Sequence, residues 1–407
     1  MRGSLVGIAV LVGCLAQSQM AQAGGLSRGS ADFDILYGDT AFGIYTGGTY
    51  VAPGRSYSRA SGLVISGGAP TPFTQSNISI SENYFVPSVS IGGRIYGDLR
   101  CAGTYTQPYG ADAKYSGAIS YHIAEQTLTT NEYGLTCGYG FNVGKGRLSI
   151  FGGGFYETIS LGQSRNFTAA FGLPGDSRVD LSSSAWGYRL GLGYEIPEIA
   201  LKAQLMYRSQ TNHNATGAYS NTPFALLAIA AGMPADIARA IYGDATSASA
   251  TASASLPQSL EMRLQSGIAP NWLAFGSVKW TDWSVLRDLQ VNEGIGGRRF
   301  STTNFFFNDG WTVTGGVGHR FNKKLGGTLS LTWDKGVTSG WDVLTDTWTV
   351  AAGAAYDVNE KFQISGGGAA IYFTEGRKSQ TSSAVDYTAT APGEWGFAFS
   401  LAGRLKF

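Results

Sequence analysis

The chain ends in Trp395-Gly-Phe-Ala-Phe-Ser-Leu-Ala-Gly-Arg-Leu-Lys-Phe407, a stretch in which bulky apolar residues take every second place. The odd-numbered positions from 395 to 407 carry aromatic or aliphatic residues except at Gly403. The large residues at these positions are Trp395, Phe397, Phe399, Leu401, Leu405 and Phe407. The even-numbered positions include Ser400, Arg404 and Lys406. A period of two with one apolar face predicts a β-strand with a dry side and a wet side. A length of about 12 residues with aromatic ends is typical of a tilted strand that crosses a bilayer.

A chain that closes such a strand on phenylalanine resembles an outer-membrane β-barrel. The last strand and the C-terminal aromatic residue of such barrels resemble the signal that the barrel-assembly machinery reads, so we expect Phe407 to contact that machinery. A soluble β-protein with an amphipathic last strand is the alternative. The other end of the chain favours the barrel.

The N-terminus has the features of an export signal. Arg2 supplies a positive charge, an apolar run extends from Leu5 to Leu15, and Ala21-Gln-Ala23 fits a cleavage site. The run is too short to span a bilayer as a helix. A lipoprotein box ending at Cys14 competes with this interpretation, but it would leave an unusually short signal. We expect residues 1–23 to be a signal peptide and the protein to lie in the bacterial outer membrane.

The composition excludes several classes of protein. The formal net charge is +1 with 14% charged residues, so neither a nucleic acid nor another polyanion is implied as a partner. No apolar run after Leu15 approaches the length of a membrane helix. The 3 histidines lack metal-ligand spacing, and no G-x-S-x-G motif occurs. We therefore expect no metal, no cofactor and no enzymatic activity.

Short turn signals divide the chain into strand pairs. Each is rich in Gly, Pro, Asn or charge, as hairpin connections are, and longer segments separate them. They are Ile91–Arg94, Asn142–Gly146, Glu195–Glu198, Ala269–Asn271, Phe321–Gly326 and Asp357–Lys361. Together with a strand at Phe42–Ala52 and the C-terminal strand, these hairpins give about 14 strands, with both chain ends on the periplasmic side. The predicted fold is all-β, a transmembrane antiparallel β-barrel over residues 42–407.

The alternation also assigns the two faces of the barrel wall. In the eighth strand the lipid-facing residues are expected to be Leu260, Met262, Leu264 and Ile268. The cations assigned to the lumen are Arg100, Arg189, Arg208, Arg263 and Lys279. Lys279 shares its face with Leu273 and Phe275, an apolar inward pair that a water-filled porin would not favour. For each cation, an ion pair with Glu157, Glu261 or Asp334 competes with contact to a ligand.

The longest outer loop is predicted over residues 212–255. Residues 223–243 within it are rich in Ala and Leu and are expected to be helical, with Pro234 before a second helical turn and Gly243 after it. The apolar residues of this stretch are Phe224, Leu227, Ile229, Met233, Ile237 and Ile241. An exposed apolar patch on a secreted surface usually marks a binding site, so we expect an external capture surface here. A lid packed on the barrel mouth is the alternative.

Several strings resemble the long-chain fatty acid transporter family, which includes toluene and xylene channels. They are Leu256-Pro-Gln-Ser259, Pro270-Asn-Trp272, Trp280-Thr-Asp-Trp-Ser284 and Asp309-Gly-Trp-Thr-Val313. The resemblance implies a fourteen-stranded barrel with an N-terminal hatch in its lumen. It also implies that hydrophobic molecules pass from an apolar groove on the outer loops to an internal pocket, and leave through a side opening or a gap beside the hatch.

The hatch is where this chain departs from the family. Between the expected signal peptide and the first strand lie only residues 24–41, and the Asn-Pro-Ala string of the family is missing from them. The segment is either a reduced plug or leaves the lumen more open than usual.

The function expected on these grounds is passive uptake of hydrophobic small molecules such as long-chain fatty acids. The alternative is a general diffusion porin for polar solutes. The candidate substrate-binding residues are Phe224, Leu227, Ile229, Met233, Ile237, Ile241, Arg100, Arg189, Leu273, Phe275 and Lys279. The expected partners are a fatty acid or aromatic hydrocarbon as ligand and the lipids of the outer membrane, with the protein as a monomer.

Two cysteines, Cys101 and Cys137, lie on neighbouring predicted strands and share the outward parity. Counting from the periplasmic ends places Cys101 level with residue 136. Cross-strand Cβ atoms lie about 4.5–5.5 Å apart, slightly farther than a disulfide prefers. Two free thiols facing lipid are therefore favoured over a disulfide.

Overall fold

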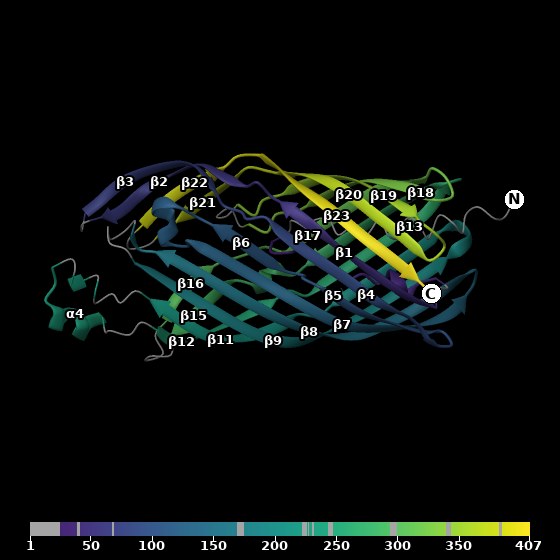
Figure 1. The fold of residues 1–407 in the computed structure, drawn as a ribbon, viewed down its shortest axis with the longest axis horizontal. Helices are drawn as coiled ribbons and strands as arrows, with labels where there is room; N and C mark the ends of the chain where they lie inside the picture. Colours follow the sequence, from purple (N-terminus) through teal and green to yellow (C-terminus); the bar gives the residue numbers. More distant parts are fainter. Residues whose placement is uncertain are drawn as a thin grey trace.

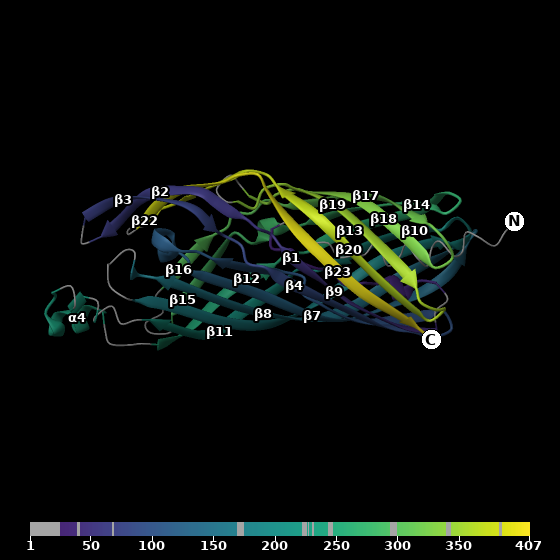
Figure 2. The ribbon, with the colours of Figure 1, turned by 45° about the horizontal axis from the view of Figure 1, so that its top comes forward.

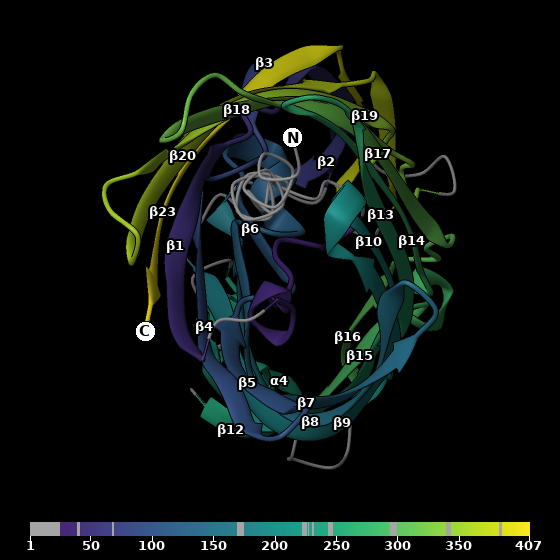
Figure 3. The ribbon, with the colours of Figure 1, turned by 90° about the vertical axis from the view of Figure 1, so that its right-hand side faces the viewer.

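The computed structural model describes residues 25–38, 41–66, 69–168, 175–221, 226, 228–229, 232–242, 247–293, 299–338, 343–381 and 385–407. This part of the chain forms a closed antiparallel β-barrel of 14 strands, seen from the side in Figure 1 and along its axis in Figure 3. β1 (Phe42–Ala52) pairs with both β23 (Glu394–Lys406) and β4 (Tyr84–Tyr96), which closes the ring. The predicted fold class is confirmed. None of the helices in the described ranges is long and apolar enough to cross a membrane.

Several barrel strands are divided into two labelled segments. Between β4 and β23 the wall consists of β5 (Leu99–Thr106) with β6 (Gly110–Lys114), β7 (Glu125–Val143), β8 (Gly146–Asn166), β9 (Asp176–Ile196), β10 (Leu201–Arg208) with β11 (Thr211–Asn221), β12 (Ser247–Leu256) with β13 (Ser259–Ala269), β14 (Trp272–Thr281) with β15 (Asp288–Glu293), β16 (Arg299–Asn304) with β17 (Gly310–Arg320), β18 (Leu325–Asp334), β19 (Thr347–Asp357) and β20 (Phe362–Phe373).

The predicted alternation of faces is confirmed. In β23 the side chains of Trp395, Phe399 and Leu401 are 57%, 61% and 68% exposed, whereas Ala398 and Arg404 are buried. The predicted outward residues of β13 are likewise exposed. Bulky apolar side chains thus face away from the barrel and polar ones face the lumen, as a lipid-embedded barrel requires.

Five of the six predicted turns lie between consecutive strands. The predicted turn at Ile91–Arg94 is wrong. β4 runs through Gly92 and Gly93 to Tyr96, and the turn falls at Gly97 and Asp98. Gly92 and Gly93 are needed inside the strand because a Cβ there would overlap carbonyl oxygens of the chain segments on either side. Gly97, with φ +53°, adopts the left-handed conformation that a tight turn favours.

A second sheet, which the sequence did not predict, extends the barrel at one end. It contains β2 (Ser56–Ser66), β3 (Ala69–Ser79), β21 (Gly376–Gln380) and β22 (Val385–Ala391) in the order β21-β22-β2-β3. The short 3₁₀ helix η2 (Gly117–Tyr121) packs against it through Ile119. The sheet lies at the end opposite to the C-terminus and the short turns (Figures 1 and 2). We assign that end to the extracellular side, because barrels of this kind have short periplasmic turns.

The predicted loop over residues 212–255 is wrong in its extent. β11 and β12 pair from Thr211 opposite Leu256 to Ser220 opposite Ser247, so the barrel wall continues through most of it. The prediction failed because the buried residues of β12 are small, such as Ala250 and Ala252, and give no strong apolar alternation. The α-helix α4 (Ala235–Tyr242) follows Pro234 and lies at the far extracellular end (Figure 1).

Candidate functional site

The N-terminal segment Gly25–Gly38 lies inside the barrel, visible in Figure 3 as the purple stretch within the ring of strands. Its short 3₁₀ helix η1 (Asp34–Leu36) belongs to an apolar cluster in the lumen. The cluster comprises Ala31, Phe33, Ile35, Leu36, Tyr37, Tyr45, Ala102, Phe151 and Met206. Along its described length, the segment is therefore packed against the inner wall.

Polar contacts fix the same segment to four different strands. Asp34 forms ion pairs with Lys202 and, at 3.6 Å, with Arg404. Arg100 donates a hydrogen bond to the carbonyl oxygen of Ile35 at 3.1 Å. The hydroxyl of Ser90 donates to the carbonyl oxygen of Asp32 at 2.8 Å. Arg100, predicted to bind substrate, thus contacts the hatch backbone.

The two carboxylates of this segment differ in acidity. Burial, followed by the negative charge of Asp34, raises the pKa of Asp32 to about 6. Burial also opposes ionisation of Asp34, but the neighbouring cations Lys202 and Arg404 outweigh it and hold the pKa of Asp34 below its ordinary value. The lumen segment thus carries one firmly ionised carboxylate and one that titrates close to neutral pH.

The third barrel strand is interrupted between β5 and β6. Its ladder with β4 stops at Ser88 opposite Thr106, and a main-chain hydrogen bond between the two edges is next found where the Glu82 amide donates to the Asp112 carbonyl oxygen at 3.1 Å. Pro87 and Pro108 lie on the two edges of this gap, and proline cannot donate a ladder hydrogen bond. We call the gap, bounded by Tyr84–Pro87 and Gln107–Ala111, the third-strand break.

The N-terminal segment fills the third-strand break from the lumen side. The Arg28 amide donates to the Pro108 carbonyl oxygen at 2.8 Å, and the Gly110 amide donates to the Leu26 carbonyl oxygen at 2.8 Å. Ser27 forms an isolated β-bridge with Tyr109. The segment thereby supplies main-chain partners in place of β4.

A cavity of ≈ 980 Å³ extends from the second sheet to the third-strand break. It is lined by residues of both sheets, of η2 and of the segment Gly25–Arg28. Its aromatic lining residues are Tyr84, Tyr115, Tyr121, Phe305, Phe306, Phe307, Phe373 and Tyr387. Its charged or titratable lining residues are Arg28, Arg55, Glu82, Asp112, His122, Arg165 and Lys378. The walls therefore combine a large apolar surface with an excess of positive charge.

Phe306 is a strained residue on the cavity wall. Its φ of +47° lies in the left-handed region, and its side chain is 50% exposed. Bulky residues rarely adopt this conformation, and strain of this kind is concentrated at ligand-binding sites. The backbone around Phe306 is held by two hydrogen bonds. The amides of Phe305 and Phe306 both donate to the Arg287 carbonyl oxygen, at 2.8 Å and 3.0 Å.

A buried charge network occupies the lumen wall below the cavity. Arg189 pairs with Glu132, and Arg208 pairs with Glu132 at 3.0 Å and with Glu157 at 2.7 Å. His213 lies 3.4 Å from Glu157. Arg189, which was predicted to bind substrate, forms an ion pair, but its partner is Glu132 and not one of the expected partners Glu157, Glu261 and Asp334.

The predicted site residues do not gather around the cavity. Leu273 is fully buried and packs with Ala200 and Phe275 near a periplasmic turn, and Lys279 faces inward. In the α4 region Ile237 is 47% exposed, and Ile229 and Met233 are half-buried. Phe224, Leu227 and the side chain of Ile241 lie outside the described residues. The eight candidates whose side chains the structure describes are absent from the lining of the cavity.

The sequence did not predict the residues that line the cavity, because segments far apart along the chain contribute them. Arg28, Asp112, Phe306 and Lys378 come from the hatch, the third strand, an outer loop and β21. One signal was present: Pro108 interrupts an alternating pattern, and proline within a strand marks an edge or a bulge.

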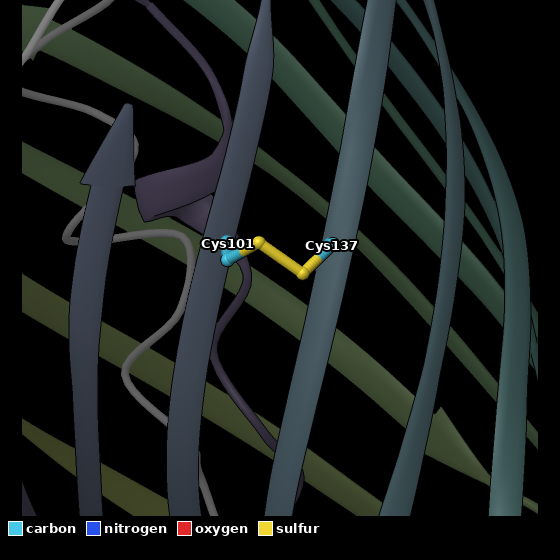
Figure 4. The surroundings of a disulfide bond; sticks show 2 residues. All are labelled: Cys101 and Cys137. Carbon is cyan, nitrogen blue, oxygen red and sulfur yellow. A yellow bond between two sulfur atoms is a disulfide. The ribbon is translucent and has the colours of Figure 1, made fainter. Parts of the chain in front are cut away.

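Cys101 and Cys137 form a disulfide, so the prediction of two free thiols is wrong (Figure 4). The two residues are direct partners in the β5–β7 ladder, with Cα atoms 4.0 Å apart. The predicted register was off by one residue. The prediction relied on an average cross-strand spacing, and individual direct pairs can lie closer than that average.

A lipid-exposed barrel with a packed N-terminal segment and an extracellular cavity defines the class of outer-membrane barrels with a plugged lumen. Residues 111–383 match the family described as "Outer membrane protein transport protein (OMPP1/FadL/TodX)". The chain belongs to this family. An outer-membrane location follows from the family and the barrel.

Individual relatives agree with this assignment. Over 284 residues the chain is 22% identical to the long-chain fatty acid transport protein of Salmonella typhi, a match that spans 62% of this chain and 64% of that protein. The crystal structure of a Pseudomonas aeruginosa FadL homologue is similar over 99% of this chain and 98% of that chain, with a TM-score of 0.75 and 14% identity. For the toluene transporter TodX of P. putida, 92% of each chain is covered, with a TM-score of 0.57 and 14% identity. These structures share the fold.

Proposed function

We propose that the protein is an outer-membrane channel for passive uptake of hydrophobic small molecules such as long-chain fatty acids. The observation that carries this proposal is the cavity, which connects the extracellular second sheet with the third-strand break. Two relatives, a long-chain fatty acid transport protein and a toluene transporter, support the same class of substrate.

The chemistry of the cavity suits an amphiphile. Transfer of an alkyl chain from water to an apolar wall gains about 0.8 kcal/mol per CH₂ group. Tyr115, Tyr387 and Phe305–Phe307 offer such a wall, and Arg165 and Lys378 place positive charge on it for a carboxylate end. The half-exposed Phe306 would be an early contact for an arriving chain. The apolar residues around α4 are proposed as the outer capture surface.

A diffusion porin is the competing function. Polar solutes need a water-filled lumen, whereas here the described N-terminal segment and its apolar cluster occupy the lumen. The hydrophobic channel is therefore the better account.

Binding of radiolabelled oleic acid to the purified protein in detergent tests the proposal. Ala113 lines the cavity on β6, and Ala113→Trp would fill part of it, so binding should weaken. Ala203→Trp is the matched control, because Ala203 lies on the outward face of β10. Equal binding by both variants and the wild type would contradict the assignment of the cavity.

A further inference from the structure

Arg55 is a buried cation at the junction between the barrel and the second sheet. It lies between β1 and β2, lines the cavity and is only 5% exposed. Its Nη1 donates to the Pro392 carbonyl oxygen at 2.8 Å, and its Nη2 donates to the Thr374 carbonyl oxygen at 2.8 Å. Nη2 also donates to the Val343 carbonyl oxygen at 3.3 Å and to the Thr345 hydroxyl at 3.2 Å. These contacts fix the guanidinium where the connections between the two sheets meet.

The contacts of Arg55 leave its charge without a counter-ion. All four acceptors are neutral, and no carboxylate of the described residues forms an ion pair with Arg55. The carboxylate of Glu394, at the start of β23, instead accepts hydrogen bonds from the amide and the hydroxyl of Ser56 at 2.8 Å and 2.5 Å. The Nε of Arg55 is buried and has no acceptor within the described part of the chain.

An anion in the cavity would relieve both of these deficits. A buried charge without a partner is costly, and an unsatisfied N–H donor adds a further cost. A carboxylate supplies the missing negative charge and the missing acceptor in one group. The electrostatics of Arg55 therefore favour a ligand with an ionised end.

The cavity wall beside Arg55 is apolar. The guanidinium carbon lies 5.4 Å from the ring centroid of Phe373, and Val51, Ile80 and Ile371 line the same cavity. Attraction between opposite charges is stronger in such surroundings than in water. Ligand sites commonly combine a mostly apolar lining with a few polar groups that fix orientation. An alkyl chain attached to the carboxylate could lie along this wall.

Arg55 differs from the other cations of the cavity. Arg28 is equally buried, but Asp112 neutralises it in an ion pair of 2.6 Å. Arg165 and Lys378 also line the cavity, but both are only half-buried, so water screens their charges more strongly. Arg55 combines full burial with the lack of an ion-pair partner among the residues that the structure describes.

We propose that Arg55 binds the ionised carboxylate of the transported molecule, so that the cavity selects long-chain fatty acids over neutral hydrophobic molecules. This inference rests on the proposed function and names its substrate class. A neutral molecule gains the apolar contact alone and leaves the Nε–H of Arg55 without an acceptor. A fatty acid gains the apolar contact and the charge-assisted hydrogen bond together.

Direct binding of radiolabelled oleic acid and of radiolabelled oleyl alcohol to the purified protein in detergent tests this proposal. The two ligands share one alkyl chain and differ in the head group, so the ratio of their affinities measures the interaction with the carboxylate. At about pH 8 a carboxyl group is ionised. We expect the wild type to bind oleic acid roughly tenfold to a hundredfold more tightly than oleyl alcohol.

Arg55→Gln should lower the affinity for oleic acid to that for oleyl alcohol and leave the affinity for oleyl alcohol unchanged. Arg55→Lys keeps the positive charge and should retain a preference for oleic acid, which a purely structural role of Arg55 does not predict. Arg59→Gln is the matched control, because Arg59 is exposed on β2 and is not among the described residues that line the cavity. It should keep the ratio of the wild type.

Two results would overturn the role of Arg55. One is an unchanged ratio in Arg55→Gln, and the other is an equal loss of affinity for both ligands, which indicates a structural role alone. Lack of binding of either ligand by the wild type would instead overturn the proposed function.

Discussion

At the scale of single residues, Asp32 and Asp34 show how position within one short segment sets ionisation. Asp34 faces Lys202 and Arg404, whereas for Asp32 burial and the charge of Asp34 are the larger influences. A buried carboxylate with a raised pKa binds its proton more tightly in the packed state than in water. The packing of the lumen segment should therefore depend on pH.

Asp32 favours packing most strongly below pH 3.8, and this contribution is lost as the pH rises through about 6. Amide hydrogen exchange of Phe33–Tyr37, corrected for intrinsic rates, should show more protection at about pH 5 than at about pH 7. Asp32→Asn keeps an oxygen acceptor for the Asp34 amide, which lies 2.8 Å away in the native contact, but cannot ionise. Its protection should be equal at both pH values, and an unchanged pH dependence would refute the role of Asp32.

The Cys101–Cys137 disulfide gives a second prediction at this scale. Its closed segment has a sequence separation of 36, and a cross-link of this kind stabilises a fold by about 2–4 kcal/mol. Cys101→Ser with Cys137→Ser should still assemble, because the β5–β7 ladder remains, but should lose its folded gel migration at a lower temperature. Mass spectrometry of the unreduced, alkylated wild type should find the linked peptides. Two alkylated cysteines would contradict the disulfide.

At the scale of elements, Phe407, the residue directly after β23, contacts the start of β1 where the barrel closes. The Phe407 amide donates to the Phe42 carbonyl oxygen at 2.8 Å, and the two rings lie 6.0 Å apart between centroids. Phe407 is also 61% exposed, so its ring remains accessible from outside the barrel. The residue can therefore serve both closure and recognition.

Phe407→Ser should lower the amount of protein assembled in the outer membrane without lowering uptake per assembled molecule. The exposed aromatic ring is the feature expected to contact the barrel-assembly machinery, and its removal leaves the pore unchanged. Quantification of the heat-modifiable folded band, with uptake normalised to it, measures both effects. Phe407→Tyr, which keeps an aromatic ring, should behave like the wild type. Normal levels of the serine variant would refute the expectation.

How much of an element could be predicted depended on the size of its alternating residues. β13 and β23 were predicted with their faces because one side carries large residues such as Leu264 and Phe399. β12 was predicted as loop because most of its buried residues are small, such as Ala250 and Ala252. Small residues bury little area, so their alternation gives a weak signal. The second sheet was missed although it buries large residues such as Tyr57 and Tyr387.

At the scale of the whole molecule, the barrel was predictable and its site was not. Strand number and sidedness follow from turns and alternation, which are local along the chain. The cavity and the third-strand break depend on contacts between distant segments, such as Arg28 with Asp112 and Arg55 with the Thr374 carbonyl oxygen at 2.8 Å. The spacing of residues along the chain does not indicate which distant segments come into contact.

The central claim is that this barrel conducts hydrophobic molecules rather than polar solutes. Its most direct test compares uptake of radiolabelled oleic acid and of a radiolabelled sugar into proteoliposomes that contain the purified protein, with protein-free liposomes as the control. Oleic acid uptake should exceed the control while sugar uptake should not, because the N-terminal segment packs inside the lumen and the cavity has a large apolar surface. Sugar uptake without any stimulation of oleic acid uptake would contradict the claim and favour a diffusion porin.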